Sequence, residues 1–417
     1  MKKADLLREK HPALVYRNYS YKLKGNNLKI AFSFLIEPDI RFKPELTIKN
    51  VKQSALDKIG ERALNNFVFH LGLIEMLSYW KATCSPEIII RAGYLDKEQT
   101  LFWHGLMING LGQFFYENRI DWRKKDFLKI TSNPGLDVKP LALAKINLKE
   151  RYLVPVSGGK DSIVTLEKLK KKEINAFLVN PSKATKDVLK IAGIKNPVVI
   201  ERKIDPNLLR LNQKGYLNGH TPFTALLSFL AVFCSALFDY KHIAFSNEKS
   251  ADEGNVRYLG KIINHQYSKS SDFERKFKSY LKKYLLLNVS YSSYLRKYSE
   301  FEIAKMFTKY PKYFKAFSSC NVGQKTGERW CNQCPKCLFV YLSLYPYLKE
   351  KEMQNIFKKD LFNDKKLLPL LKSLMGQGKE KPFECVGTYQ ESKLALKMSF
   401  KKAEKLKHVP YLLAKIK

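Results

Sequence analysis

The stretch Tyr152-Leu-Val-Pro-Val-Ser-Gly-Gly-Lys-Asp-Ser-Ile-Val-Thr-Leu-Glu167 decides how the central part of this chain folds. A short apolar strand runs into a loop at residues 157–162, and a segment with helical spacing follows at once. Such a turn directs several backbone N–H groups and a helix N-terminus at one point, which suits an anion. Gly158 and Gly159 let the main chain approach oxygen atoms closely, and Lys160 adds a positive charge. The loop predicts an anion-binding site, and an ordinary Gly-Gly turn is the alternative.

This loop differs from the Walker phosphate-binding loop at two positions. Val154 stands where that motif has its first glycine, and Asp161 stands where it has Ser or Thr. The six residues instead resemble the signature of the PP-loop ATP pyrophosphatases, a superfamily that cleaves ATP between its α and β phosphates to AMP and pyrophosphate. The resemblance implies ATP and magnesium as cofactors. It also implies an ATP-binding set that consists of Ser157, Gly158, Gly159, Lys160, Asp161 and Ser162.

Strands and helices are predicted to alternate from Arg151 onward. The predicted strands are residues 152–156, 176–179, 198–201 and 243–246, and the predicted helices are residues 162–172, 183–192 and 221–238. Such alternation is typical of an α/β fold with a parallel, doubly wound sheet, whose ligands gather at the carboxyl ends of the strands. Together with the loop it predicts a sheet of the PP-loop (HUP-like) type.

The sequence before this sheet predicts a separate α+β region. Its predicted strands are residues 28–36, 42–48 and 87–92, and its predicted helices are residues 63–80 and 99–118. Asn133, Pro134 and Gly135 break the pattern, and a linker near residues 140–150 leads to the central strand. We therefore expect four parts: the α+β region at 1–148, the PP-loop domain at 149–317, a metal-binding and helical region at 318–392, and a basic tail at 393–417.

The composition is that of a basic globular protein. The 417 residues carry a formal net charge of +36, with 45% hydrophobic and 13% aromatic residues. Most of the cations are Lys and are spread along the chain, so anionic small substrates explain the charge as well as nucleic acid does. The longest apolar segment, residues 223–238, is shorter than the about 20 residues that span a membrane, and no apolar signal segment opens the chain. We expect a cytoplasmic, soluble chain with a small-molecule substrate, no membrane contact and nucleic acid as an alternative partner.

Four of the seven cysteines form a spaced motif. Cys320, Cys331, Cys334 and Cys337 follow the spacing C-x10-C-x2-C-x2-C. Thiolates two residues apart bend around one tetrahedral ion, and a fourth from a nearby loop closes the shell. Because four cysteines leave no open coordination position, the motif predicts a structural zinc. An iron–sulfur cluster stays open as the alternative, since four thiolates also suit it.

Polar segments elsewhere contain further candidate residues. Ser246, Asn247 and Glu248 follow a predicted strand, where a nucleotide and its magnesium would lie. The other candidates are His220 before the apolar helix, Glu253, His265 and the lone thiol of Cys385 beside Glu384. Capping and turn chemistry is the alternative for the Ser, Asn, Asp and Glu positions, and a buried structural thiol is the alternative for Cys385.

Taken together, these segments resemble the MurL epimerase family over about residues 67–392. The matching segments, in order, are 70–81, 157–162, 217–224, 246–255, 263–269, 319–321, 329–337 and 381–387. The loop and the cysteine motif are shared with other PP-loop enzymes such as 7-cyano-7-deazaguanine synthase, whereas segments 70–81 and 381–387 favour the epimerase. The heavy Lys content and the basic tail depart from the family pattern and leave an additional partner open.

The resemblance implies a reaction. The family inverts the terminal L-glutamate of UDP-N-acetylmuramoyl-L-alanyl-L-glutamate, a peptidoglycan precursor, and consumes ATP. Adenylation neutralises the carboxylate, so the α-proton can leave as an enolate forms, and AMP and pyrophosphate are released. Lys160 with magnesium would offset charge on the leaving group. The base stays open among His220, His265, Cys385 and Glu253, with a histidine preferred.

Two other functions fit parts of the sequence. The first is a PP-loop enzyme that adenylates an RNA base or a deazapurine carboxylate, which the high charge favours. Against it, thiolation of RNA needs a thiol pair outside the metal site. The second is a zinc-stabilised nucleic-acid-binding module with an inactive ATP loop, and the complete loop with Lys160 and Asp161 argues against it.

Overall fold

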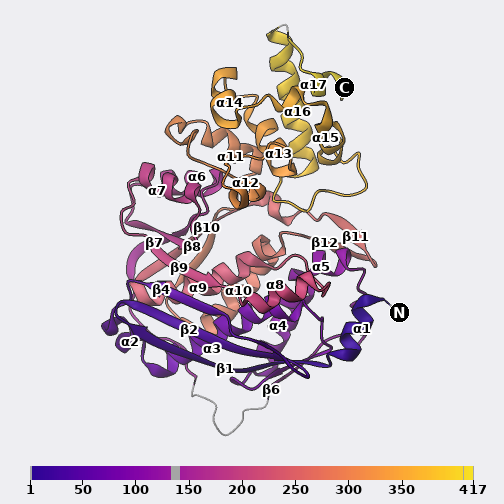
Figure 1. Cartoon of the computed structure of the whole chain (residues 1–417). Coiled ribbons are helices and arrows are strands. Elements are labelled where there is room, and N and C mark those ends of the chain that lie inside the picture. The colour runs from indigo at the N-terminus through magenta and orange to yellow at the C-terminus, as the bar shows by residue number, and fades with distance from the viewer. Residues whose placement is uncertain (1, 133–140, 407, 417) are drawn as a thin grey trace. The chain divides into compact units, whose positions relative to one another are not determined.

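The computed structural model describes residues 2–132, 141–406 and 408–416. Two compact units make up the chain, and each is assembled from three separate segments (Figure 1). Unit 1 consists of Met1–Leu153, Val198–Ile243 and Tyr258–Tyr291, and unit 2 consists of Val154–Pro197, Ala244–Arg257 and Ser292–Lys417. The predicted break at residues 133–135 lies outside the described residues, and the four predicted parts of the chain stay predictions.

Unit 1 contains a mixed sheet. In sheet order its strands are β9 (Val198–Lys203), β4 (Glu45–Lys49), β2 (Asn27–Ile36), β1 (Ala13–Lys24), β5 (Glu87–Ile90) and β6 (Lys129–Ser132), with β3 (Ile40–Phe42) also beside β2. The pairs β9–β4, β4–β2 and β2–β1 are antiparallel, whereas β1–β5 and β5–β6 are parallel. The sheet is therefore mixed, because β9, a strand of the predicted parallel set, runs antiparallel to β4, a strand of the predicted α+β region. A strand's alternating pattern defines its two faces but not its direction.

The strand that leads into the 157–162 loop is parallel to its neighbour in the sheet, as predicted. β7 (Lys149–Pro155) and β10 (Tyr240–Glu248) pair from Tyr240 beside Lys149 to Ile243 beside Leu153. In chain order β7 leads directly into the 157–162 loop, and Ser246–Glu248 are the last three residues of β10. Both candidate nucleotide segments thus lie at the carboxyl ends of two neighbouring parallel strands.

Two helices of unit 1, α3 (Glu61–Trp80) and α9 (Phe223–Phe238), are buried along nearly all of their length. The other helices of this unit are α1 (Lys3–Lys10), α2 (Gln53–Ile59), α4 (Lys97–Gly110), α5 (Gly112–Glu117), α8 (Pro206–Gln213) and α10 (Ser271–Tyr284). α3 and α9 pack together, with the rings of Phe67 and Phe233 stacked at 5.1 Å, which confirms the buried helix predicted at 221–238. Among the described residues, no helix is both long enough and apolar enough to cross a membrane.

Unit 2 begins with a strand–loop–helix segment. α6 (Lys160–Leu169) follows the loop directly, and β8 (Ile174–Val179) and α7 (Lys183–Ala192) come next. The backbone N–H of Val156 donates to the carbonyl of Phe177 in β8 at 3.0 Å. The bounds of α7 match the prediction because Ser182 caps its start and Gly193, at φ +76°, ends it.

The remainder of unit 2 is mostly helical. It contains the end of β13 (Ser290–Leu295), α11 (Glu300–Phe307), α12 (Asn321–Thr326), α13 (Pro335–Leu344), α14 (Glu350–Phe357), α15 (Leu368–Leu374), α16 (Tyr389–Lys405) and α17 (Tyr411–Lys415). Ala395, Ser399 and Ala403 recur every four residues on α16 and are fully buried. The first part of the predicted basic tail, up to Lys405, thus belongs to the amphipathic helix α16, which packs on α13.

Candidate functional site

The 157–162 loop adopts a conformation that requires glycine. Gly158 has φ +87°, and a Cβ on it would lie 2.8 Å from the backbone N of Thr185. Its carbonyl accepts a hydrogen bond from the backbone N–H of Ser318 at 3.0 Å. Gly159 is the N-cap of α6, and a Cβ there would lie 3.1 Å from Ser319 Oγ. The loop therefore packs backbone to backbone between α7 and the segment that leads to the first cysteine.

The predicted ATP-binding residues of the loop differ in their exposure. Ser157 is exposed, Asp161 is half-buried, and Ser162 is buried with its hydroxyl donating to the Gly159 carbonyl at 2.9 Å. The N-terminus of α6 follows immediately, and its first backbone N–H groups have no partner within the helix. Ser157 and this helix end offer donors to an anion.

Lys160 is a buried cation held by two carboxylates. Its side chain is 0% exposed, and Nζ forms ion pairs with Asp161 and with Glu300 at the start of α11. Burial alone would lower the pKa of Lys160, but the two carboxylates raise it above its usual value. Lys160 is therefore fully charged at neutral pH. Sequence reasoning missed Glu300, which lies 140 positions from Lys160 along the chain.

Glu300 also faces a second buried cation. Lys336 Nζ lies 3.5 Å from Glu300 Oε1 and donates to the carbonyl oxygen of Cys385. Lys336 is 5% exposed and Glu300 is 1% exposed. The backbone N–H of Glu300 donates to Ser250 Oγ at 3.0 Å, which fixes the start of α11. Lys160, Asp161, Glu300 and Lys336 thus form one buried set of two cations and two anions.

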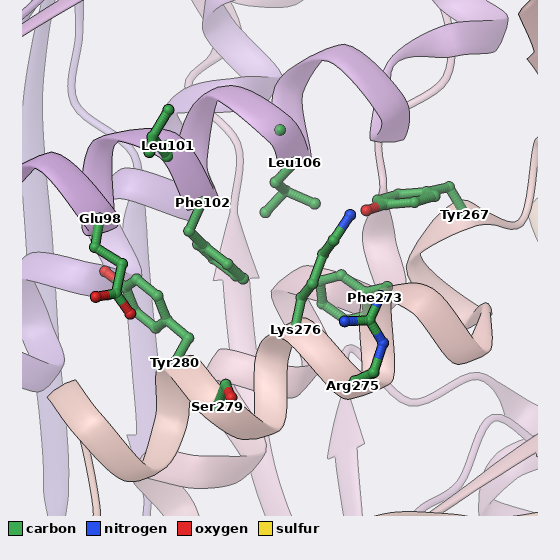
Figure 2. A pocket seen from close by; sticks show the side chains of 11 residues that line it. Glu98, Leu101, Phe102, Leu106, Tyr267, Phe273, Arg275, Lys276, Ser279 and Tyr280 are labelled. Atoms are coloured by element: carbon green, nitrogen blue, oxygen red, sulfur yellow. The ribbon is translucent and has the colours of Figure 1, made fainter.

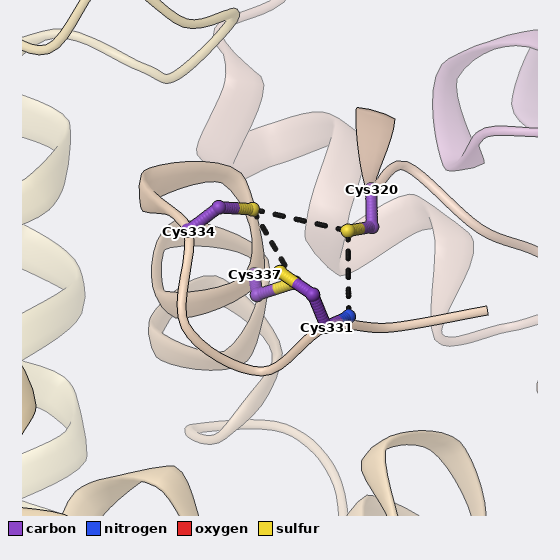
Figure 3. A group of neighbouring side chains, drawn as sticks. All are labelled: Cys320, Cys331, Cys334 and Cys337. Atoms are coloured by element: carbon purple, nitrogen blue, oxygen red, sulfur yellow. Dashed lines mark hydrogen bonds between the residues drawn. The ribbon is translucent and has the colours of Figure 1, made fainter. Parts of the chain in front are cut away.

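The four predicted cysteines converge on one point (Figure 3). Their Sγ atoms all lie within 4.8 Å of one another, with 3.9 Å from Cys320 to Cys334, 3.8 Å from Cys331 to Cys337 and 3.5 Å from Cys334 to Cys337. Bonds of about 2.3 Å to one tetrahedral ion place the sulfurs about 3.8 Å apart. In an iron–sulfur cluster the ligands are shared among several irons and stand farther apart. The spacing therefore fits a single ion.

The surroundings of the cysteines favour thiolates. The backbone N–H groups of Gly323 and Cys331 donate to Cys320 Sγ at 3.1 and 3.4 Å. Cys334 is the N-cap of α13, and Cys337 lies in its first turn, where the helix dipole stabilises negative charge. The other cysteines differ: Cys84 and Cys234 are fully buried, as expected for core positions, and Cys385 is half-buried.

The Ser246–Glu248 segment is anchored through two of its three candidate residues. Asn247 Nδ2 donates to Ser293 Oγ at 3.0 Å, and the backbone carbonyl of Glu248 accepts from Arg296 at 2.8 Å. Ser246 Oγ, by contrast, is buried and has no hydrogen-bond partner among the described residues. An orphaned buried hydroxyl at the end of a parallel strand suits a bound ligand.

Glu253 and Cys385 lie on segments that are tied to each other. Glu253 Oε1 is 3.0 Å from Lys381 Nζ and accepts from the backbone N–H of Tyr389 at 3.2 Å. Asn255 Nδ2 donates to the carbonyl of Pro382 at 2.9 Å. The structure thus brings segments 246–255 and 381–387 together, and Lys336 links the second to the buried charges beside the loop.

Both candidate histidines lie in unit 1, where they contact each other. The ring centroids of His220 and His265 are 4.4 Å apart, and His265 Nδ1 bonds to Gln113 Oε1 at 2.5 Å. Lys81, which is 6% exposed, donates to the Gly219 carbonyl. Burial, His265 and Lys81 lower the pKa of His220 to about 2. Burial and the cation of Arg202 lower the pKa of Lys81 to about 8.

Two of these observations bear on proton transfer. His220 is neutral at pH 7, but its lowered pKa makes it a weak proton acceptor, whereas the pKa of Lys81, at about 8, lies close to neutral pH. The histidine rings are in contact, so in this arrangement they do not stand on opposite faces of a substrate carbon. Sequence reasoning missed Lys81, although it closes the 70–81 segment.

Unit 1 also contains a cavity of about 330 Å³ between α4 and α10 (Figure 2). The rings of Phe102 and Tyr280 stack at 4.1 Å on one side, and Arg275, Lys276 and Tyr267 approach from the other. Both cations pair with Asp272 at 2.6 and 2.7 Å.

The chain matches two family models. Residues 6–294 match the MurL N-terminal domain, and residues 316–415 match the MurL C-terminal domain. Three curated relatives share the name UDP-N-acetyl-alpha-D-muramoyl-L-alanyl-L-glutamate epimerase. The Micromonospora relative is 34% identical over 79% of this chain and 73% of its own length. The corresponding values are 33%, 84% and 78% for the Xanthomonas oryzae relative and 35%, 93% and 84% for the Salinispora tropica relative.

These similarities separate the functions that the sequence left open. The named relatives are epimerases, which agrees with the family resemblance of the sequence. The alternative of an enzyme that adenylates an RNA base or a deazapurine carboxylate has no support among them.

Proposed function

Because this chain belongs to the MurL family, we propose that it inverts the terminal L-glutamate of UDP-N-acetylmuramoyl-L-alanyl-L-glutamate to D-glutamate. The observation that carries the proposal is the shared name of three relatives, each at least 33% identical over at least 79% of the chain. The product would serve peptidoglycan precursor synthesis, and the enzyme would work in the cytoplasm on a small-molecule substrate.

ATP activates the substrate in this proposal. The γ-carboxylate and α-carboxylate of a terminal glutamate repel a carbanion at Cα, so the proton there is hard to remove. A carboxylate oxygen attacks the α-phosphorus of ATP, pyrophosphate leaves, and the resulting acyl-adenylate is neutral at that carboxyl. A base can then take the α-proton, an acid returns a proton on the other face, and water releases AMP with the carboxylate restored.

The 157–162 loop is the proposed ATP site, of the PP-loop type. The exposed Ser157, the glycine backbone and the N-terminus of α6 would hold the pyrophosphate part, and Ser246 Oγ has hydrogen-bonding capacity left for the nucleotide. Lys160 is charged and adjacent, and would offset charge on the leaving group. Magnesium would supply further charge neutralisation. Asn247 and Glu248 stay candidates for the nucleotide and its magnesium.

The proposed base is a histidine of the His220–His265 pair. The Gln113 contact orients His265, which makes it the preferred member of the pair, because the lowered pKa of His220 makes that ring a weak proton acceptor. Glu253 is a weaker candidate because it already pairs with Lys381. The thiol of Cys385 is half-buried and stays a candidate. Single variants His220→Asn, His265→Asn and Cys385→Ala, followed by deuterium wash-in at Cα, identify the base as the one whose loss stops wash-in.

The metal is proposed to be zinc with a structural role. The four thiolates satisfy one tetrahedral ion and leave no open coordination position for substrate. Metal analysis of the purified chain, with one zinc per chain expected, tests this assignment. Iron with a visible charge-transfer absorption would contradict it.

A chemical assay tests the whole proposal. Purified protein is incubated with ATP, magnesium and UDP-N-acetylmuramoyl-L-alanyl-L-glutamate, the product is hydrolysed, and its glutamate is resolved on a chiral column while AMP is measured. D-glutamate that appears together with AMP, and only with ATP, is the expected result. D-glutamate without ATP consumption would remove the activation step and keep the epimerase. Intact L-glutamate with intact ATP would contradict the proposed function.

A further inference from the structure

Unit 2 contains a line of buried charge that joins the 157–162 loop to the cysteine helix α13. Glu300 contacts Lys160 at one carboxylate oxygen and Lys336 at the other. Lys336 is the residue between Pro335 and Cys337, so it moves with the metal-binding turn. All three residues are at most 5% exposed. Solvent therefore screens their interaction very little.

A second contact strengthens this line at the metal end. Lys336 donates to the carbonyl of Cys385, and Asn321, the residue after Cys320, donates to Glu384 at 3.0 Å. The segment that contains Glu384 and Cys385 is thus held from both sides of the cysteine cluster. The position of Lys336 consequently depends on the geometry of all four cysteines.

A bound anion at the loop competes with Glu300 for the cation of Lys160. A phosphate oxygen attracts Lys160 and weakens its hold on Glu300. The carboxylate then depends more strongly on Lys336, since weakening the pairing of a buried charge is costly. Glu300 and Lys336 bind each other more tightly, and the turn from Cys334 to Cys337 becomes more firmly placed.

We propose that Glu300 and Lys336 are positioning residues that couple metal binding at the four cysteines to nucleotide binding at the loop. The proposal rests on the proposed function, because it takes ATP as the ligand of the loop. Such coupling is reciprocal: the factor by which nucleotide strengthens metal binding equals the factor by which metal strengthens nucleotide binding. The metal-binding turn thereby helps to place Lys160 for its role at the leaving group.

The test uses the metal-loaded chain and an equilibrium measurement. Zinc retained against a fixed concentration of a chromogenic chelator is measured with and without a non-hydrolysable ATP analogue and magnesium. A blank without protein corrects for zinc bound by the analogue. We expect the analogue to strengthen zinc binding about fivefold or more. In Lys336→Met the effect of the analogue should vanish, in Lys336→Arg it should partly return, and in Lys351→Met, an exposed lysine of the same unit, it should be unchanged.

The outcomes separate this proposal from the proposed function. If the analogue leaves zinc retention in the unaltered chain unchanged or lowers it, the coupling is overturned. This part of the test uses the unaltered chain, so it does not depend on the folding of any variant. If AMP still forms in the epimerase assay, the proposed function survives that result. A chain that binds no analogue and forms no AMP overturns both. An analogue effect that persists in a folded Lys336→Met variant also overturns the assigned route.

Discussion

Replacing Glu300 by glutamine should destabilise unit 2 strongly. The side chain is 1% exposed and serves two cations, Lys160 and Lys336. After the change Lys160 keeps Asp161, but among the described residues the one remaining partner of Lys336 is the carbonyl of Cys385, so one buried ammonium loses its countercharge. Breaking a buried ion pair in this way costs about 3–5 kcal/mol. For a cooperative unit of roughly 150–250 residues this lowers Tm by about 6–20 °C.

The assay is thermal unfolding of the metal-loaded chain at neutral pH, measured by calorimetry. The double variant Glu300→Gln with Lys336→Met removes the unpaired cation together with its partner. Its loss in the free energy of unfolding should therefore be smaller than the sum of the two single losses by at least about 1 kcal/mol. Glu302→Gln, which changes an exposed carboxylate of α11, is the matched control and should cost less than about 1 kcal/mol, because glutamine also serves at this position of a capping box. A fall in Tm of less than about 2 °C for Glu300→Gln, or strict additivity in the double variant, would refute the reasoning.

Four further outcomes follow from the structure. Lys160→Ala should lower AMP formation by at least about 100-fold, and AMP release at the normal rate would contradict the loop assignment. Cys334→Ser should lose zinc and lower Tm, measured by metal analysis and calorimetry, whereas Cys84→Ser should keep its zinc. Burial lowers the pKa of His70 from 6.5 to about 4, so its neutral form favours folding above pH 6.5 and that contribution, about 3 kcal/mol, is lost as pH falls toward 4. In His70→Gln the urea concentration at the unfolding midpoint should depend less on pH over that range. An unchanged pH dependence would exclude His70 as the cause. His265→Asn should abolish deuterium wash-in at Cα while AMP still forms, and normal wash-in would exclude His265 as the base.

Local features of the fold were predictable from the sequence. The strand at β2, the buried helix α9 and the bounds of α7 follow from residue periodicity and capping, which act over a few positions. β1 (Ala13–Lys24) escaped prediction because a register shift between Tyr16 and Asn18 and several polar residues interrupt its alternation. The antiparallel direction of β9 depends on its partner β4, which lies far away in the sequence.

The candidate site shows the same division. The glycines, Lys160 and the cysteine spacing are local motifs, and the structure places the four cysteines around one point as predicted. Glu300 carries no motif apart from its place after a helix cap, so only the folded chain shows that it pairs with Lys160. Lys336 was visible inside the cysteine motif, but its orientation toward Glu300 depends on how α13 packs against α11.

The interleaved assembly of the two units has a consequence for synthesis on the ribosome. Unit 1 needs Tyr258–Tyr291 to complete it, so Met1–Leu153 emerges without its last segment. At about 5–20 residues per second the roughly one hundred intervening residues take roughly 5–20 s to appear. For most of that time apolar surface on α3 has no partner from α9, and for all of it none from the last segment. A chain shortened before Tyr291 should therefore yield neither unit in native form.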